Sequence, residues 1–223
     1  LPGKTQTPML TSRRALGKVD VVFPVLHGPF GEDGTVQGLL KLANLPFVGA
    51  GVLGSAVGMD KDVMKRLLRD AKIPIAKFLV FERSAASKID FASVKRALGL
   101  PFFVKPANLG SSVGISKVTA NKQFDSAIAE AFRYDNKILL EENIHGREIE
   151  CSVLGNENPI ASLPGEIITP HDFYSYDAKY LDKGSELVIP AKLPKQKQKE
   201  VQQLAVKAFQ AVDCSGLARV DFL

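Results

Sequence analysis

The stretch that most constrains the fold is residues 102–117, where two apolar runs flank a loop rich in glycine and serine. Residues 102–104 predict a strand, and Pro106 ends it because proline has no N–H to donate to a sheet. A second strand is predicted over 115–118, so the Gly-Ser-Ser-Val-Gly loop at 110–114 closes a hairpin. The N–H and hydroxyl groups of this loop could surround a phosphate, although an ordinary hairpin is an equal alternative. The Walker P-loop is excluded, because it needs Gly-x4-Gly-Lys-Ser/Thr before a helix.

Composition narrows the function classes. The chain has 223 residues, 45% of them hydrophobic, and a net charge of +5. That is enough apolar content for a core in up to three lobes, and the charge is compatible with anionic small ligands. No apolar run approaches the roughly 20 residues of a membrane span, and no nucleic-acid motif or signal peptide is seen. Cys151 and Cys214 are predicted to be free buried thiols, so we expect a cytoplasmic protein without nucleic-acid or membrane partners.

The amino-terminal part predicts an α/β unit. A continuous apolar run at 19–26 predicts a buried strand, Thr35 is expected to cap a helix over 35–44, and a further strand follows at 47–49. His27 and Glu32 lie in the loop between the first strand and the helix, which contains several glycines. This loop is on the side where such units bind ligands. A lone histidine is more often structural, but an acidic residue five positions on favours a functional site.

Periodicity predicts the other elements. The strands are expected at 78–81, 137–146 with a polar turn at its end, 147–154, 187–190 and 216–223, and the helices at 61–71, 91–98, 124–132 and 197–212. Asp60 is expected to cap the first of these helices. Residues 164–186 are irregular and aromatic-rich, which is typical of a lid over a ligand.

Two charged positions carry open alternatives. Lys61 lies in the first turn of its helix, where the helix dipole disfavours a cation. It is therefore either a solvated lysine or one placed to meet an anion. Arg219 and Asp221 are two apart on a strand and point the same way. They form either a salt bridge or an anion clamp beside a Mg²⁺ ligand.

Seven motifs, in order and with matching gaps, resemble the D-alanine–D-alanine ligase family from about residue 19 to residue 223. They are His27-Gly…Gly31-Glu-Asp-Gly34, Met59-Asp-Lys61, Val104-Lys-Pro106, Gly110-Ser-Ser-Val-Gly114, Glu148-Ile-Glu150, Ala178-Lys-Tyr180 and Leu217-Ala-Arg-Val-Asp221. The resemblance implies the ATP-grasp fold, of the α/β class with α+β lobes. We expect a partial amino-terminal domain at 1–50, a central lobe at 51–141 and a truncated carboxyl-terminal lobe at 142–223.

The resemblance also implies an activity. ATP would phosphorylate the carboxylate of one D-alanine, and the amine of a second would attack the acyl phosphate to give D-alanyl-D-alanine for peptidoglycan. The implied cofactors are ATP and Mg²⁺ or Mn²⁺, the other ligand is D-alanine, and a homodimer is suggested.

Residue roles follow from the resemblance alone. Those implied for ATP are Lys61, Lys105 and Ser112 at the phosphates, Glu141, Glu142 and Ile144 in the hinge at the adenine, and Glu148 at the ribose. Those implied for chemistry are Lys179 at the transferred phosphoryl group, Ser111 and Tyr180 orienting the first substrate, Arg219 at the oxyanion and Asp221 on Mg²⁺. His27, oriented by Glu32, would lie near the second substrate.

Two family motifs are absent, the amino-terminal Gly-Gly-x-Ser-x-Glu and the Asn-Glu-x-Asn that supplies further Mg²⁺ ligands. We therefore expect a partial chain, and a polypeptide of only this length would be an inactive nucleotide-binding remnant. A D-alanine–D-lactate ligase is an alternative that Lys179 and Tyr180 disfavour. Another ATP-grasp carboxylate–amine ligase and a nucleotide-binding module without chemistry are the remaining alternatives.

Overall fold

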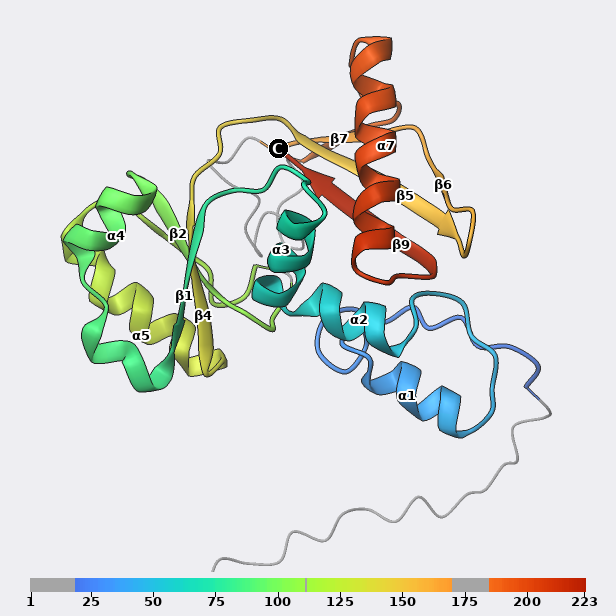
Figure 1. The fold of residues 1–223 in the computed structure, drawn as a ribbon, viewed down its shortest axis with the longest axis horizontal. Helices are drawn as coiled ribbons and strands as arrows, with labels where there is room; N and C mark the ends of the chain where they lie inside the picture. Colours follow the sequence, from blue (N-terminus) through green and yellow to red (C-terminus); the bar gives the residue numbers. More distant parts are fainter. Residues whose placement is uncertain (1–18, 111, 170–184) are drawn as a thin grey trace, which may run out of the picture.

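A computed structural model describes residues 19–110, 112–169 and 185–223. Two antiparallel sheets stand apart, and helix α3 lies between them (Figure 1). The helices are α1 Thr35–Leu42, α2 Val52–Met59, α3 Lys61–Asp70, α4 Phe91–Leu98, α5 Phe124–Tyr134 and α7 Lys195–Ala211, with 3₁₀ turns η1 Arg83–Lys88 and η2 Asn121–Gln123. The strands are β1 Phe78–Glu82, β2 Phe102–Pro106, β3 Ser116–Val118, β4 Lys137–Glu142, β5 Glu148–Gly155, β6 Ile160–Ala161, β7 Gly165–Ile168, β8 Glu186–Val188 and β9 Gly216–Phe222.

The first sheet has the strand order β1-β4-β2-β3 and confirms the predicted hairpin. Because side chains alternate along a strand, β2 sends Phe102 and Val104 into a core with α4 and α5, and Phe103 and Lys105 to the opposite face. Helix α5 covers the core face with the five apolar residues expected of it, all buried: Phe124, Ala127, Ile128, Ala131 and Phe132. One face of the sheet is therefore packed against α4 and α5, and the other, which α3 covers in part, leaves room for a site.

The second sheet is built around β5. Strand β9 pairs with β5 along nearly the whole length of β5, and β6 and β7 each pair with part of β5. Strand β8 pairs with β7. Ile149, Cys151 and Val153 alternate into the interior as predicted, and Cys151 and Val153 pack with Phe209 of α7. Both cysteines are free, as expected, although Cys214 is only half-buried.

Helix α3 is tied to the first sheet by charge. Asp60 caps it as predicted, its Oδ1 accepting the N–H groups of Asp62 and Val63 at 3.0 and 3.1 Å. Lys137, at the start of β4, donates to Asp60 Oδ2 at 2.6 Å and to Asp62 Oδ2 at 3.2 Å. Burial raises the pKa of Asp60, but these bonds outweigh it and hold that pKa below its usual value. The start of α3 is thereby fixed against the sheet.

The predicted buried strand at 19–26 is wrong. Within the described residues this run makes one parallel bridge, between Val22 and Phe47, and side chains such as Phe23 are exposed at 65%. A continuous apolar run becomes a buried strand only where neighbours cover both its faces, and the described residues do not cover these.

Two smaller expectations also differ. Thr35 does not cap α1; the residue at that position is Gly34, and Asp33 accepts the Thr35 N–H at 2.9 Å. The segment expected to be irregular from 164 contains β7, which pairs with both β5 and β8. The rest of the proposed lid, at 170–184, lies outside the described residues.

The core of the first sheet gives a stability test. Phe102 is fully buried, and the centre of its ring lies 6.3 Å from the centre of the Phe91 ring and 6.0 Å from that of the Phe124 ring. Replacing it with alanine leaves a cavity, so we expect Phe102→Ala to lower the free energy of unfolding by about 3–5 kcal/mol in urea denaturation. Ile160→Ala, at a position exposed at 66%, should change it by no more than about 0.5 kcal/mol. Equal losses would contradict the assigned core.

Candidate functional site

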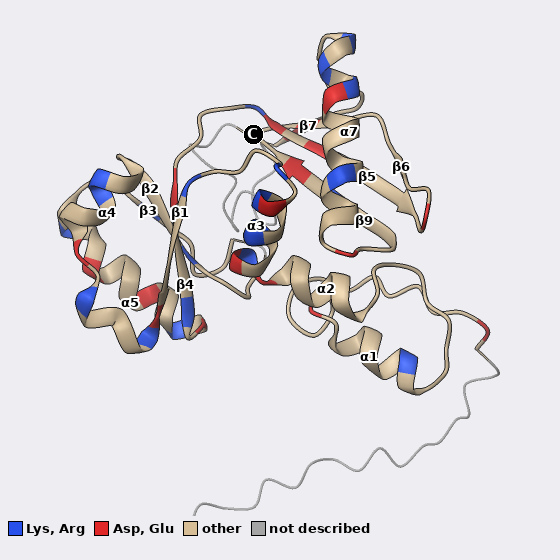
Figure 2. Cartoon of the chain, in the orientation of Figure 1, with Lys and Arg blue, Asp and Glu red and all other residues tan. Residues whose placement is uncertain are grey.

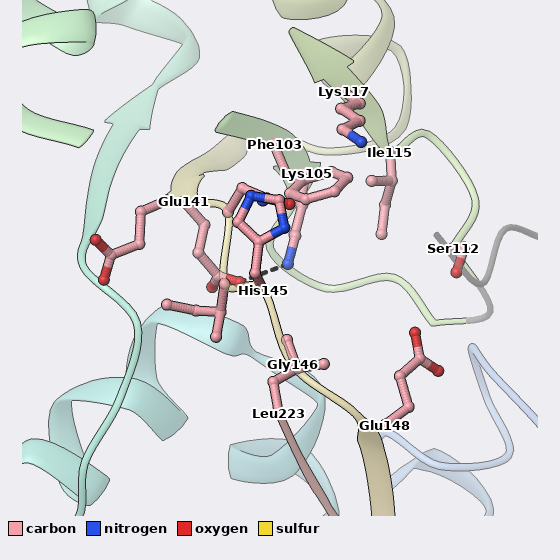
Figure 3. A pocket seen from close by; sticks show the side chains of 13 residues that line it. Phe103, Lys105, Ser112, Ile115, Lys117, Glu141, His145, Gly146, Glu148 and Leu223 are labelled. Carbon is pink, nitrogen blue, oxygen red and sulfur yellow. Dashed lines mark hydrogen bonds and ion pairs between the residues drawn. The ribbon is translucent and has the colours of Figure 1, made fainter. Parts of the chain in front are cut away.

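A cavity of about 350 Å³ opens on the face of the first sheet opposite α4 and α5. Small-molecule sites typically enclose roughly 300–1,000 Å³, so its size fits a ligand. β2, the loop after it, β3 and the segment joining β4 to β5 line the cavity (Figure 3). Six of the residues predicted to bind ATP lie together in this lining: Lys105, Ser112, Glu141, Glu142, Ile144 and Glu148.

The strongest electrostatic feature of the cavity is the carboxylate of Glu141. Its Oε1 accepts from Lys105 Nζ at 2.6 Å and its Oε2 pairs with Lys65 Nζ at 2.7 Å. All three side chains are less than 20% exposed. Burial raises the pKa of Glu141, but the two ammonium groups outweigh it and keep that pKa below its usual value. Glu141 is therefore a fixed anion between two cations.

Lys61 is half-buried and hydrogen-bonded to backbone carbonyls rather than fully solvated. Its Nζ donates to the carbonyls of Pro106 and Ala107, each at 3.3 Å, and to that of Leu109. Burial, followed by the positive charge of Lys105, lowers the pKa of Lys61 from 10.5 to about 8. Lys61 is not among the residues that line the cavity. In this structure it holds residues 106–109, which lead into the Gly-Ser-Ser-Val-Gly loop at 110–114. We call that loop the glycine-rich loop.

Residues 106–109 are also held by hydrogen bonds to residues 135 and 137, just before and at the start of β4. Ala107 donates its N–H to Lys137 O at 3.0 Å. Asn108 donates from its backbone and its side chain to Asp135 Oδ2, at 2.8 and 3.0 Å. Three hydrogen bonds from Lys61 to residues 106–109 and two from Asn108 to Asp135 thus fix the approach to Gly110.

The glycine-rich loop departs from ordinary backbone geometry. Ser112 has φ = 59° and Gly114 has φ = 70°, both in the left-handed region. A Cβ on Gly114 would lie 2.7 Å from the Tyr134 ring and 2.9 Å from Pro106, so only glycine fits there. A serine held at positive φ is strained, and such strain is often found at ligand-binding loops. Ser111, the other predicted hydroxyl of this loop, lies outside the described residues.

Arg219 and Asp221 form a separate group on β9. Arg219 Nε and Nη2 donate to the two Asp221 oxygens at 2.7 and 3.0 Å, and Nη1 lies 3.2 Å from Glu150 Oε1. The expected common face is confirmed, but neither residue lines the cavity. The Asp221 hydrogen bond raises the pKa of Arg219 in spite of burial. Lys179 and Tyr180, predicted to act with them, lie outside the described residues.

His27 and Glu32 lie in the loop before α1, and both are exposed. Glu32 Oε2 accepts the N–H of Gly28 at 2.5 Å. In this structure Glu32 therefore orders the loop backbone, whereas we expected it to orient the His27 imidazole. The loop approaches the glycine-rich loop, because a Cβ on Gly110 would lie 3.8 Å from Gly28 Cα. The negative charge of Glu32 also acts on Arg219.

Residues of this region that sequence reasoning missed include Phe103 and Lys117 in the cavity lining, Lys65 beside Glu141, and Glu150 beside Arg219. Alternation along β2 and β3 could have identified the first two, since Phe103 pairs with Lys117 in the sheet. Lys65 lies one helical turn after Lys61, which is the one signal the sequence gives for it.

Comparison with known proteins supports one family throughout. A family model described as "D-ala D-ala ligase C-terminus" matches residues 67–223, and one described as "D-ala D-ala ligase N-terminus" matches residues 3–50. A D-alanine–D-alanine ligase of Oceanobacillus iheyensis is 54% identical over 99% of this chain and 61% of its own length. D-alanine–D-alanine ligase A of Salmonella typhimurium is 51% identical over 99% of this chain and 62% of its own length. The chain thus spans about three fifths of the curated relatives it matches.

Solved structures agree. The VanG D-Ala:D-Ser ligase of Enterococcus faecalis superposes with a TM-score of 0.82 and 41% identity, over 92% of this chain and 59% of that one. The D-alanine–D-alanine ligase of Coxiella burnetii gives a TM-score of 0.77 and 42% identity, over 92% and 55%. The expected ATP-grasp fold is confirmed.

Lys61 gives a pH test of the site. Its pKa falls from 10.5 to about 8 on folding, so between these values the unfolded chain binds more protons and stability rises with pH. Below about pH 8 its buried charge lowers stability in full. We expect the difference in unfolding free energy, wild type minus Lys61→Met, to rise by up to roughly 3 kcal/mol between pH 7.5 and 10.5. Urea denaturation at several pH values measures it, and a flat difference would contradict a buried charged Lys61.

Proposed function

The chain belongs to the D-alanine–D-alanine ligase family, and on this premise we propose that its protein joins two D-alanines in an ATP-dependent reaction that forms ADP. The observation that carries the proposal is the cavity itself. It brings together the Lys105 ammonium and the strained glycine-rich loop, and a nucleotide needs such cations and donors around its phosphates. The product would serve peptidoglycan synthesis.

The cavity lining supports the nucleotide roles. Lys105 and the loop at Ser112 would hold the phosphates, since an ammonium and the donors of a Gly/Ser loop both favour anions. Glu141, Glu142 and Ile144 would place the adenine along the strand end, and Glu148 would bind the ribose hydroxyls. Lys61 would contribute positive charge from behind the loop and hold its entrance in position.

The chemistry has two steps. The carboxylate oxygen of the first D-alanine attacks the γ-phosphorus of ATP, and the bond to the ADP oxygen breaks. The amine of the second D-alanine attacks the acyl carbon, and the resulting tetrahedral species collapses with loss of phosphate and a proton. We assign Arg219 to the developing oxyanion, which preorganised donors stabilise, and Lys179 to the transferred phosphoryl group.

The other roles concern orientation. Ser111 and Tyr180 would orient the first D-alanine. His27, in the loop that approaches Gly110, would lie near the second.

Asp221 fits Mg²⁺ or Mn²⁺ only as one ligand among several. The described residues contain no group of three or more His, Cys, Asp or Glu side chains able to hold a metal. Mg²⁺ is commonly bound by one or two carboxylates together with substrate phosphates, so a single Asp221 carboxylate is compatible with it. The ion would neutralise the charge that develops on the phosphates.

Further properties follow from the family as proposals. We propose three lobes at 1–50, 51–141 and 142–223, a cytoplasmic location and a homodimer. None of the helices in the described part of the chain is both long and apolar enough to cross a bilayer.

The test is ADP release by the full-length protein with ATP and Mg²⁺, with products weighed by mass spectrometry. We expect release to depend on D-alanine and to give the dialanine, and L-alanine to give none. Lys105→Met should lower kcat/KM for ATP by about a hundredfold or more, because it removes the cation at the phosphates. Lys88→Met, on the 3₁₀ turn η1, is the matched control and should behave as wild type.

Additional substrates separate the alternatives. A mixed ester from D-alanine plus D-lactate, or a D-alanyl-D-serine product, would turn the assignment toward those ligases. ATP binding without D-alanine-dependent turnover would leave a nucleotide-binding module.

A further inference from the structure

Lys65 is buried at a place where an apolar side chain would be expected. It lies on α3, its side chain is 11% exposed, and its Nζ sits 5.5 Å from the centre of the Phe78 ring. A buried lysine costs free energy unless it is paired, and replacing a buried ion pair by apolar residues is often neutral or stabilising. The charge at this position is therefore not explained by stability alone.

The ion-pair partner of Lys65 is Glu141, which lines the cavity. Glu141 Oε2 binds Lys65 at 2.7 Å, while its Oε1 binds Lys105 at 2.6 Å. Phe78 lies directly opposite Glu141 in the β1–β4 pairing, and Phe103 lies opposite it in the β2–β4 pairing. The carboxylate is thus held between two strands, with one lysine on each oxygen.

Lys65 does not reach the cavity. Lys105 and Glu141 line it, whereas Lys65 lies behind Glu141 on α3, which carries charges of both signs (Figure 2). The contact by which Lys65 can act on the cavity is its ion pair with Glu141. That makes it a positioning residue and not a catalytic one.

The charges of the three groups show what it would do. Together they carry one positive charge, and without Lys65 the remaining Lys105–Glu141 pair is neutral. A neutral pair attracts a polyphosphate far less than a cation does, and both Glu141 oxygens would then be free to compete for the Lys105 ammonium.

We propose that Lys65 sets the nucleotide affinity of this site by holding one oxygen of Glu141, so that Lys105 keeps net positive charge for the phosphates. The inference deepens the proposed nucleotide binding and rests on it. The interaction belongs to the bound ground state and the transition state alike, so its loss should raise KM for ATP and leave kcat nearly unchanged.

The experiment is isothermal titration of ADP into the full-length wild type and the variants, well below their melting temperatures, followed by kcat and KM for ATP. We expect Lys65→Met to raise the Kd for ADP about tenfold. Lys65→Arg keeps the charge and the donor, and should recover most of the affinity. Arg69→Met removes a charge one turn along the same helix, at an exposed position, and should bind ADP as wild type does.

A second pair of variants isolates the route through Glu141. In a Glu141→Gln background the carboxylate no longer competes for Lys105, so adding Lys65→Met should change the Kd for ADP much less than it does in the wild type. An equal change in both backgrounds would overturn the proposal. If Lys65→Met does not fold, Lys65→Gln, which keeps a donor but not the charge, is used in both backgrounds instead.

The remaining outcomes are distinguishable. A wild-type protein that binds no ADP overturns the proposed function and this inference with it. Wild-type ADP binding that Lys65→Met leaves intact, with only a lower melting temperature, overturns this inference alone and makes Lys65 a structural residue.

Discussion

The site depends on one buried negative charge. Glu141 allows Lys65 and Lys105 to lie close together within the fold, where two ammonium groups without a counter-charge would repel each other strongly. The same charges act on Lys61: the charge of Lys105 lowers the pKa of Lys61, and the charge of Glu141 raises it. The three lysines come from α3 and β2, and Glu141 comes from β4, so a single carboxylate joins a helix and two strands.

Rigidity and strain are distributed unevenly around this charge. The chain at 106–109 is fixed by Lys61 and by Asn108, and α3 is fixed by Lys137 through Asp60 and Asp62. The adjoining loop, by contrast, holds Ser112 at a positive φ that a serine adopts only at a cost. A strained loop on rigid supports is suited to binding, since its geometry is established before a ligand arrives.

Local pattern predicted much of the fold because local pattern decides which face of an element is buried. The apolar face of α5 and the alternation of β5 were both predictable, since each follows from its own period. The strand at 19–26 was not, because its burial depends on neighbours that the run itself does not specify. The pairing of Lys105 with Glu141 was equally hidden: it arises from the antiparallel alignment of β2 with β4 across 36 positions. Family resemblance pointed to six residues that line the cavity, but not to Lys65, which looks like any helical lysine.

Strand β2 serves two purposes in alternate positions: Phe102 and Val104 fill the core, and Phe103 and Lys105 face the site. Insertion or loss of a single residue upstream of Phe102, if the strand kept its hydrogen bonds, would exchange the two sets. The lysine would then enter the core, and Val104 (after an insertion) or Pro106 (after a deletion) would take the place of the cation. The spacing between the end of α4 and Lys105 is therefore under a stricter constraint than the identity of most residues within it, and length variation in this family should be confined to loops elsewhere.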